Sequence, residues 1–207
     1  MKKIDIGLIG FGTIGTGVVR LLRENGELIS ERVGAEIHLK RIADIDIKKD
    51  RGVEIGRTLL TKDAGDILND SEISIVVELI GGYEPARTFI LDAMSLKKHV
   101  VTANKALLAT HGDEIFQQAL SEGVNIGFEA SVGGTIPVIK TIKESLIANR
   151  ILSIFAIMNG TSNFILSKMT DEGKPFADVL KEAQRLGFAE ADPTYDVEGI
   201  DLSLIHI

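Results

Sequence analysis

The chain of 207 residues contains no cysteine, which excludes disulfide bonds and thiolate chemistry and fits a reducing compartment. It has four prolines and no low-complexity tract, so little of it is expected to be disordered. The formal net charge is -7 and no run of lysine or arginine stands out, which argues against a nucleic-acid-binding surface. The uncharged stretch 151–167 is shorter than the ~20 residues that cross a bilayer and is polar at its centre, so no membrane span is expected. With 44% hydrophobic residues, the composition predicts a globular, cytoplasmic protein.

The first part of the chain alternates strand and helix patterns. The run 73–80 is nearly all β-branched or leucine, which is typical of a strand buried on both faces of a parallel sheet. Similar strand patterns lie at 4–9, 36–43, 99–102 and 124–129, separated by helical patterns that end at Asn25-Gly26 or cover 85–96 and 112–122. This alternation predicts an α/β fold with a doubly wound, Rossmann-like parallel sheet.

The sequence GFGTIG lies between the first predicted strand and the first predicted helix. In that position a G-x-G-x-x-G pattern indicates a dinucleotide-binding turn. Gly10 permits a tight turn, Gly12 lets the backbone approach a pyrophosphate, and Gly15 allows close packing of the helix on the sheet. The helix start adds unpaired N–H groups and a positive dipole end. We therefore predict an NAD or NADP site along the whole turn, with contacts from Gly10, Phe11, Gly12, Thr13, Ile14 and Gly15.

The choice between NAD and NADP stays open. An acid that binds the ribose hydroxyls usually lies ~20 residues beyond the motif, and the candidates here, Asp44 and Asp46, lie farther along. A loop over 25–34 would absorb the excess. Arg41 and Arg57 are available for the 2′-phosphate of NADP.

The strand ends after the motif predict the other end of the cofactor site. Gly81 and Gly82 follow the strand pattern 73–80, and Lys105 follows the pattern 99–102. Because ligands of doubly wound sheets bind at the carboxyl ends of the strands, we expect the nicotinamide near these three residues.

The second part of the chain changes character. A helix is predicted from Thr135, with Pro137 in its first turn, followed by a strand over 151–158 and the polar sequence NGTSN. Apolar residues then repeat at helical spacing over 176–186, and Gly187 suits a C-cap. This pattern predicts an α+β domain that is incomplete.

Six blocks of the sequence, taken together and in order, resemble the homoserine dehydrogenase family. They are GLIGFGTIGTGV, VVELIGG, VVTANKALLA, FEASVGGTIPVI, MNGTSNFIL and EAQRLGFAEADPTYDVEGID. The resemblance implies NAD(P)-dependent interconversion of L-homoserine and L-aspartate 4-semialdehyde, a step toward threonine, methionine and isoleucine. It also implies an NAD(P)-binding Rossmann domain over 1–130, the start of a substrate domain over 131–201, and a homo-oligomeric full-length form.

The resemblance assigns roles to several residues. It implies that Glu190 and Asp196 contact the substrate, whose ammonium group suits this carboxylate-rich segment, and that Asp201 belongs to the catalytic site. Lys105 is placed beside nicotinamide and substrate, where a lysine can take or give the alcohol proton. The resemblance also implies a second lysine four positions after Asp201 as the proton donor and acceptor, and this sequence has Ile205 there, which can neither donate nor accept a proton. We therefore expect the chain to bind dinucleotide but to turn over no homoserine.

The resemblance also implies a site for a monovalent cation. Its ligands map to the side chain of Glu129 and to the backbone carbonyls of Val132, Gly134 and Ile136. Ligation mostly by carbonyl oxygens suits a hard cation such as sodium.

The last six residues, LSLIHI, depart from the family pattern. They are the translation of CTG-TCT-CTT-ATA-CAC-ATC, which resembles a transposon end used to prepare sequencing libraries. We therefore expect a C-terminally truncated chain with a non-native tail over 202–207, against the alternative of a divergent native tail. Any other codon choice in the nucleotide sequence would refute the tail hypothesis.

Two other functions are considered. One is another oxidoreductase of aspartate-derived substrates, such as an aspartate dehydrogenase, against which the NGTSN and EADPTYDVEGID blocks argue. The other is a non-catalytic dinucleotide-binding protein, which Ile205 in place of lysine superficially favours.

Overall fold

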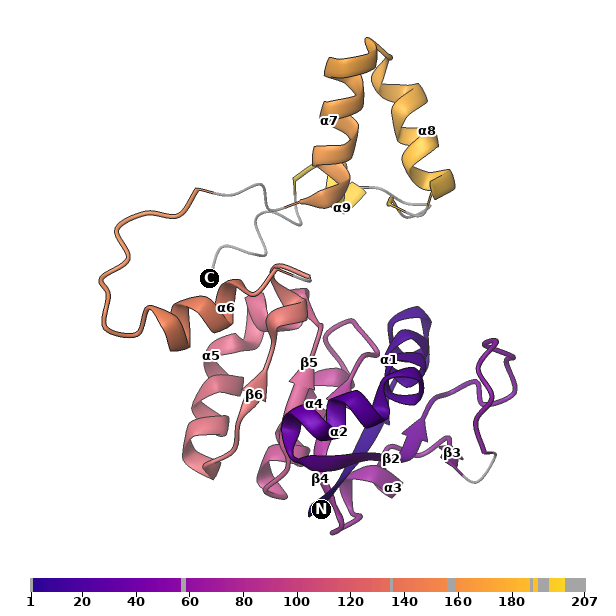
Figure 1. The fold of residues 1–207 in the computed structure, drawn as a ribbon, viewed down its shortest axis with the longest axis vertical. Coiled ribbons are helices and arrows are strands. Elements are labelled where there is room, and N and C mark those ends of the chain that lie inside the picture. The colour runs from indigo at the N-terminus through magenta and orange to yellow at the C-terminus, as the bar shows by residue number, and fades with distance from the viewer. Residues whose placement is uncertain are drawn as a thin grey trace. The chain divides into compact units, whose positions relative to one another are not determined.

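The computed structural model describes residues 2–56, 59–134, 136–155, 159–186, 188–189 and 194–199, without the side chains of Tyr195 and Asp196. The chain divides into two compact units, residues 1–139 and 140–207 (Figure 1). The domain boundaries at 130 and 201 stay predictions.

Unit 1 is built on a six-stranded sheet in the order β3-β2-β1-β4-β5-β6. Every strand pair is parallel. The strands are β1 (Lys2–Ile9), β2 (Ala35–Ala43), β3 (Leu60–Thr61), β4 (Ile73–Glu78), β5 (His99–Thr102) and β6 (Ile126–Gly127). Because the order runs outward in both directions from the β1–β4 pair, the sheet is doubly wound, as predicted.

The helices of unit 1 cover both faces of this sheet (Figure 1). One core contains Ile9 and Ala43 together with residues of α3 (Gly65–Leu68), α4 (Ala86–Ser95) and α5 (Lys105–Glu122). The other core contains Leu8 and Ile42 together with Val19 of α1 (Thr13–Glu24). Since neighbouring strand residues point to opposite faces, these two cores lie on opposite sides of the sheet.

The segment between the first helix and the second strand differs from the prediction. A loop is predicted over 25–34, but the structure has a second helix, α2 (Gly26–Val33), which ends at Gly34 in the left-handed conformation. The extra residues before Asp44 are therefore absorbed by helix. The predicted strand 124–129 is also wrong in its length, because only β6 pairs with β5 and Glu129 opens a 3-10 turn, η2 (Glu129–Ser131).

Unit 2 contains a helical hairpin. Its helices α7 (Gly160–Glu172) and α8 (Phe176–Leu186) pack side by side through Ile165, Val179 and Ala183 (Figure 1). The NGTSN sequence begins α7, because the Oδ1 atom of Asn159 accepts a hydrogen bond from the Ser162 N–H at 2.7 Å. A short helix, α9 (Thr194–Val197), follows.

The predicted helix after Thr135 and the predicted strand over 151–158 both need correction. The helix is reduced to α6 (Val138–Lys140) and the π-helical η3 (Thr141–Ser145). Residues 151–155 form no strand, and 156–158 lie outside the described residues. Leu152 is 85% and Phe155 is 94% exposed. A strand needs a partner for its backbone hydrogen bonds, and the described residues of unit 2 contain no strand.

No helix in the described ranges is long and apolar enough to cross a membrane.

Candidate functional site

The glycine-rich turn closes over the ends of three strands. The Gly10 N–H donates to the Ala43 carbonyl at 2.9 Å, and the Leu79 N–H donates to the Ile9 carbonyl at 2.8 Å. Gly10 has a φ of 100°, and a Cβ atom there would lie 2.6 Å from the carbonyl carbon of Leu79. Only glycine fits this position, because both the backbone conformation and the close approach of β4 exclude a side chain.

The other two motif glycines play different parts. A Cβ atom on Gly15 would lie 2.1 Å from the Gly10 carbonyl oxygen, whereas a Cβ atom on Gly12 would meet nothing within 4 Å. Gly15 therefore lets α1 pack against the turn, and Gly12 borders open space. No side chain among the described residues caps the start of α1. Its first N–H groups can therefore serve an anion such as a pyrophosphate.

Asp44 and Arg51 fasten the loop after β2 to the glycine-rich turn. The Oδ2 atom of Asp44 accepts from the Phe11 N–H at 2.7 Å, and its Oδ1 atom accepts from Arg51 Nη2 at 2.9 Å. The Arg51 guanidinium also donates to the Phe11 and Asp46 carbonyls and lies 4.8 Å from the centre of the Phe11 ring. Arg51 is a structural residue of this site that the sequence reasoning missed, because its partners are distant in sequence.

A groove of about 480 Å³ runs along the carboxyl ends of β1, β2 and β4. It lies where the strand order reverses, which is the place where open α/β sheets bind ligands. The groove brings together four predicted cofactor residues, namely Gly10, Gly12, Asp44 and Gly81. Its apolar walls were not predicted as part of the site, because no role was assigned to the residues that form them: Ile9, Ala43, Ile45, Ala64, Leu79, Ile80, Pro85 and Phe89.

Charged side chains of both signs line the groove. Asp44 and Glu84 are the acids, and Lys62 is the base. The Thr88 hydroxyl donates to Glu84 at 2.8 Å, and this bond, with help from Arg87, holds the pKa of Glu84 below its usual value. Glu84 therefore keeps its negative charge at neutral pH.

Some predicted residues lie elsewhere. Arg41 Nη1 lies 3.6 Å from Asp66 Oδ2, and Arg41 does not line the groove. Arg57 is outside the described residues. Phe11 and Thr13 line a neighbouring cavity of about 430 Å³, which shares Gly12 with the groove. Ile14 is exposed on α1.

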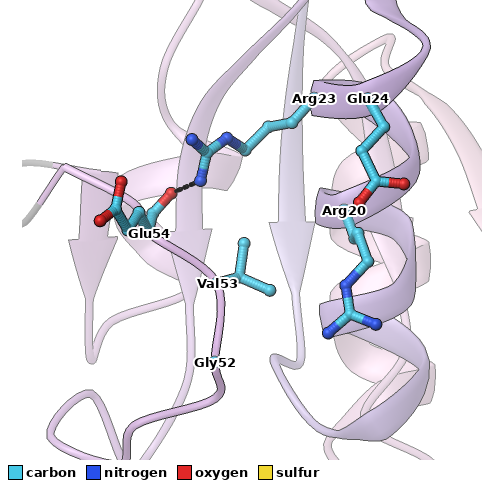
Figure 2. A pocket seen from close by; sticks show the side chains of 6 residues that line it. All are labelled: Arg20, Arg23, Glu24, Gly52, Val53 and Glu54. Atoms are coloured by element: carbon cyan, nitrogen blue, oxygen red, sulfur yellow. Dashed lines mark hydrogen bonds between the residues drawn. The ribbon is translucent and has the colours of Figure 1, made fainter.

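A third cavity, of about 340 Å³, lies between α1 and the loop after β2. Figure 2 shows Arg23 reaching from α1 to the loop, where it donates to the Glu54 carbonyl, while Arg20 and Glu24 lie along the helix. This third cavity contains none of the predicted cofactor residues, whereas the groove at the strand ends contains four and the neighbouring cavity three.

The predicted nicotinamide end is held together by Asn104. This residue caps α5 by accepting from the Leu107 N–H at 3.1 Å, and its Nδ2 atom donates to the Gly82 carbonyl at 2.6 Å. Lys105 is the first residue of α5 and is half-buried. The structure thus links Gly82 and Lys105 through one buried side chain.

The predicted cation ligands lie in and after the 3-10 turn η2. The Glu129 Oε1 atom accepts from the Ile139 N–H at 2.8 Å, and the Ile136 carbonyl accepts from the Val138 N–H at 2.8 Å. Within the described part of the chain, no three acidic or histidine side chains gather as a metal site. A site made mostly of carbonyl oxygens would not be of that kind.

The predicted substrate residues are not placed by the structure. Glu190, Asp201 and Ile205 lie outside the described residues, as does the tail over 202–207. Asp196 lies in α9, but its side chain is not described.

Two family models match the chain. Residues 10–129 match the model described as homoserine dehydrogenase, NAD binding domain, and residues 137–204 match the model described as homoserine dehydrogenase. The chain belongs to the homoserine dehydrogenase family. The homoserine dehydrogenase of Pseudomonas aeruginosa is 51% identical over 97% of this chain, which covers 46% of that protein. The homoserine dehydrogenase of Bacillus subtilis is 46% identical with the same coverage of both chains.

The chain is also similar in structure to solved homoserine dehydrogenases. The enzyme from Thiobacillus denitrificans is 52% identical, with a TM-score of 0.89 over 99% of this chain and 47% of that one. A hyperthermophilic archaeal homoserine dehydrogenase, solved in complex with NADPH, is 28% identical, with a TM-score of 0.81 over 98% of this chain and 67% of that one. The chain spans about half the length of the curated relatives it matches.

Proposed function

We propose that unit 1 binds NAD or NADP in the groove and that the protein serves the interconversion of L-homoserine and L-aspartate 4-semialdehyde. The observation that carries the proposal is the groove itself, which joins Gly10, Gly12 and Asp44 to Gly81 at the strand-order reversal. The pyrophosphate would lie against the turn at Gly12 and the start of α1, and the ribose would lie near Asp44. The dinucleotide supplies the hydride acceptor or donor when bound.

Lys105 is the proposed catalytic residue of unit 1. It stands at the start of α5, which Asn104 ties to the Gly82 carbonyl at 2.6 Å, so the proposed nicotinamide end includes this lysine. Its amine would lie beside the nicotinamide and the substrate and would assist the transfer of the alcohol proton to and from the second lysine of the family, which this chain lacks at Ile205. Asp201 is proposed to share the catalytic site, with Glu190 and Asp196 binding the ammonium of homoserine. A homo-oligomeric full-length form and a cytoplasmic location complete the proposal.

The activity can be tested in a chimaera. Residues 1–201 of this chain would be joined to the matching remainder of the Bacillus subtilis relative, and NAD(P)H oxidation would be followed with aspartate 4-semialdehyde. We expect turnover, and we expect Lys105→Met to lower kcat by about 10²–10⁴-fold. Lys48→Met, on an exposed loop outside the groove, is the matched control. Full activity of Lys105→Met would refute the catalytic role, and binding of neither dinucleotide would refute the groove assignment.

A monovalent cation such as sodium is proposed at Glu129 and the carbonyls of Val132, Gly134 and Ile136. The donor set, one carboxylate and several carbonyl oxygens on one short segment, suits a hard cation. Thermal unfolding should then occur at a higher temperature in sodium chloride than in an equal concentration of tetramethylammonium chloride. Glu129→Gln should abolish that difference, and a difference that persists in this variant would contradict the site.

A further inference from the structure

Glu78 is a fully buried carboxylate at the carboxyl end of β4, with 0% of its surface exposed. Its side chain has no ion-pair partner in the described part of the chain and accepts hydrogen bonds from one hydroxyl and from backbone N–H groups. The Oε2 atom accepts from the Thr102 hydroxyl at 2.7 Å. The Oε1 atom accepts from the Ile80 N–H at 2.8 Å and from the Gly81 N–H at 3.4 Å. Burying a carboxylate without a cation costs free energy, which its hydrogen bonds must offset.

The direction of each hydrogen bond around Glu78 is fixed. The Asn104 N–H can only donate, and it donates to the Thr102 hydroxyl oxygen at 3.0 Å. The hydroxyl proton of Thr102 is therefore directed at Glu78, whose other oxygen faces backbone N–H donors. All of these partners donate, so the geometry accommodates an ionised carboxylate, which only accepts. A glutamine here would present an amide NH2 to one of these donors.

The partners of Glu78 belong to the two segments that form the proposed nicotinamide end. Its Oε1 atom holds the backbone of Ile80 and Gly81, which line the groove. Through Thr102 it reaches Asn104, which in turn holds the Gly82 carbonyl and caps α5 just before Lys105. Gly81 and Gly82 both have a φ of 73°. One buried carboxylate thus holds a turn of two left-handed glycines and, through two side chains, the start of a helix.

We propose that Glu78 is a positioning residue for the nicotinamide half of the cofactor. Its charge holds the turn after β4 and, through Thr102 and Asn104, the first residue of α5 in one arrangement. The phosphate-binding turn and the loop at Asp44 have hydrogen bonds of their own, from the Gly10 N–H to Ala43 and from the Phe11 N–H to Asp44, and neither of these bonds involves Glu78. This inference rests on the proposed binding of NAD(P) in the groove.

Two ligands allow binding to the adenosine half of the site to be measured separately from binding to the nicotinamide half. ADP-ribose keeps both phosphates and both riboses but lacks nicotinamide, whereas NADH has the complete cofactor; NADPH and 2′-phospho-ADP-ribose serve if the chain prefers NADP. Calorimetric titration of the 207-residue chain gives both dissociation constants. We expect Glu78→Gln to weaken NADH binding by about tenfold, as one lost bond to a charged group implies, and to leave ADP-ribose binding within about twofold.

Thr102 supplies variants that test the same network. Thr102→Val removes the hydroxyl and should reproduce the selective loss of NADH binding, even if Glu78→Gln fails to fold. Thr102→Ser keeps the hydroxyl and should restore the wild-type ratio of the two dissociation constants. An equal loss for both ligands, or no loss for either, in the folded variants would overturn the positioning role. A wild-type chain that binds neither ligand would instead overturn the proposed function, and this inference with it.

Discussion

The N–H group of Phe11 donates to the carboxylate of Asp44 over 2.7 Å, although the two residues are 33 positions apart. This bond joins the glycine-rich turn after β1 to the first residue after β2. Asp44 also lines the groove proposed for the dinucleotide. The residue predicted only as a ribose ligand is thus also part of the framework that shapes the site.

Replacing Asp44 by asparagine should lower the stability of unit 1. An amide can accept from the Phe11 N–H or from Arg51, but not from both in the present geometry. We expect a loss of about 1–3 kcal/mol in the free energy of unfolding. Native-state hydrogen exchange of the β1 and β4 amides measures unit 1 separately from unit 2. Asp50→Asn, whose carboxylate accepts only from the exposed Gly52 N–H, is the control and should change little.

Two glycines on α1 should respond to alanine in opposite directions. A Cβ atom on Gly15 would lie 2.1 Å from the Gly10 carbonyl oxygen, so Gly15→Ala must push the helix from the turn and should cost about 1–3 kcal/mol. Gly17 has nothing within 4 Å of its Cβ position, so Gly17→Ala should stabilise the helix by about 0.5–1 kcal/mol. The same exchange experiment measures both, and equal effects would contradict the described packing.

Acid should destabilise unit 1 partly through Asp70. Lys40 Nζ lies 2.7 Å from Asp70 Oδ2, and this hydrogen bond holds the pKa of Asp70 below the ordinary value of 3.8. The pKa of Asp70 is lower in the folded than in the unfolded chain. The stability that the ionised Asp70 contributes is therefore complete above about pH 4–5 and is lost as the pH falls through the folded pKa. Lys40→Met should lower stability at neutral pH and reduce its further fall in acid.

Hydrogen exchange at neutral pH and at about pH 3 compares these variants. Lys48→Met, which removes an exposed lysine that forms no ion pair with the described residues, controls for the change in net charge. An acid-induced loss as large in Lys40→Met as in the wild type would show that the pair contributes nothing to the pH dependence.

The sheet and the glycine-rich turn could be predicted because their signals are local. The alternating apolar runs and the spacing of Gly10, Gly12 and Gly15 are each contained within a few residues. The groove walls could not be predicted in this way. Lys62 and Phe89 reach the groove because β3 and α4 lie beside the motif in space, and no local pattern marks them.

Other differences come from tertiary context. The α2 helix occupies a segment that contains Asn25, Gly26 and Gly34, which by themselves favour a loop, but α2 contacts both α1 and β2. The apolar run at 151–155 has the composition of a strand, yet strand structure depends on a neighbouring strand. Arg41 pairs with Asp66 of α3 because it lies on the same face of β2 as Ala43, which contacts that side of the core.

The most direct test of this account is a fluorescence titration of NADH and NADPH into the 207-residue chain and its Gly12→Val variant. A Cβ atom at position 12 meets no protein atom within 4 Å, so we expect the variant to fold like the wild type while blocking the approach of the pyrophosphate. Gly26→Ala, at another position with open space around its Cβ, is the matched control. We predict that the wild type and Gly26→Ala bind dinucleotide and that Gly12→Val binds at least about tenfold more weakly. Equal affinity of Gly12→Val and wild type would contradict the placement of the cofactor on the glycine-rich turn.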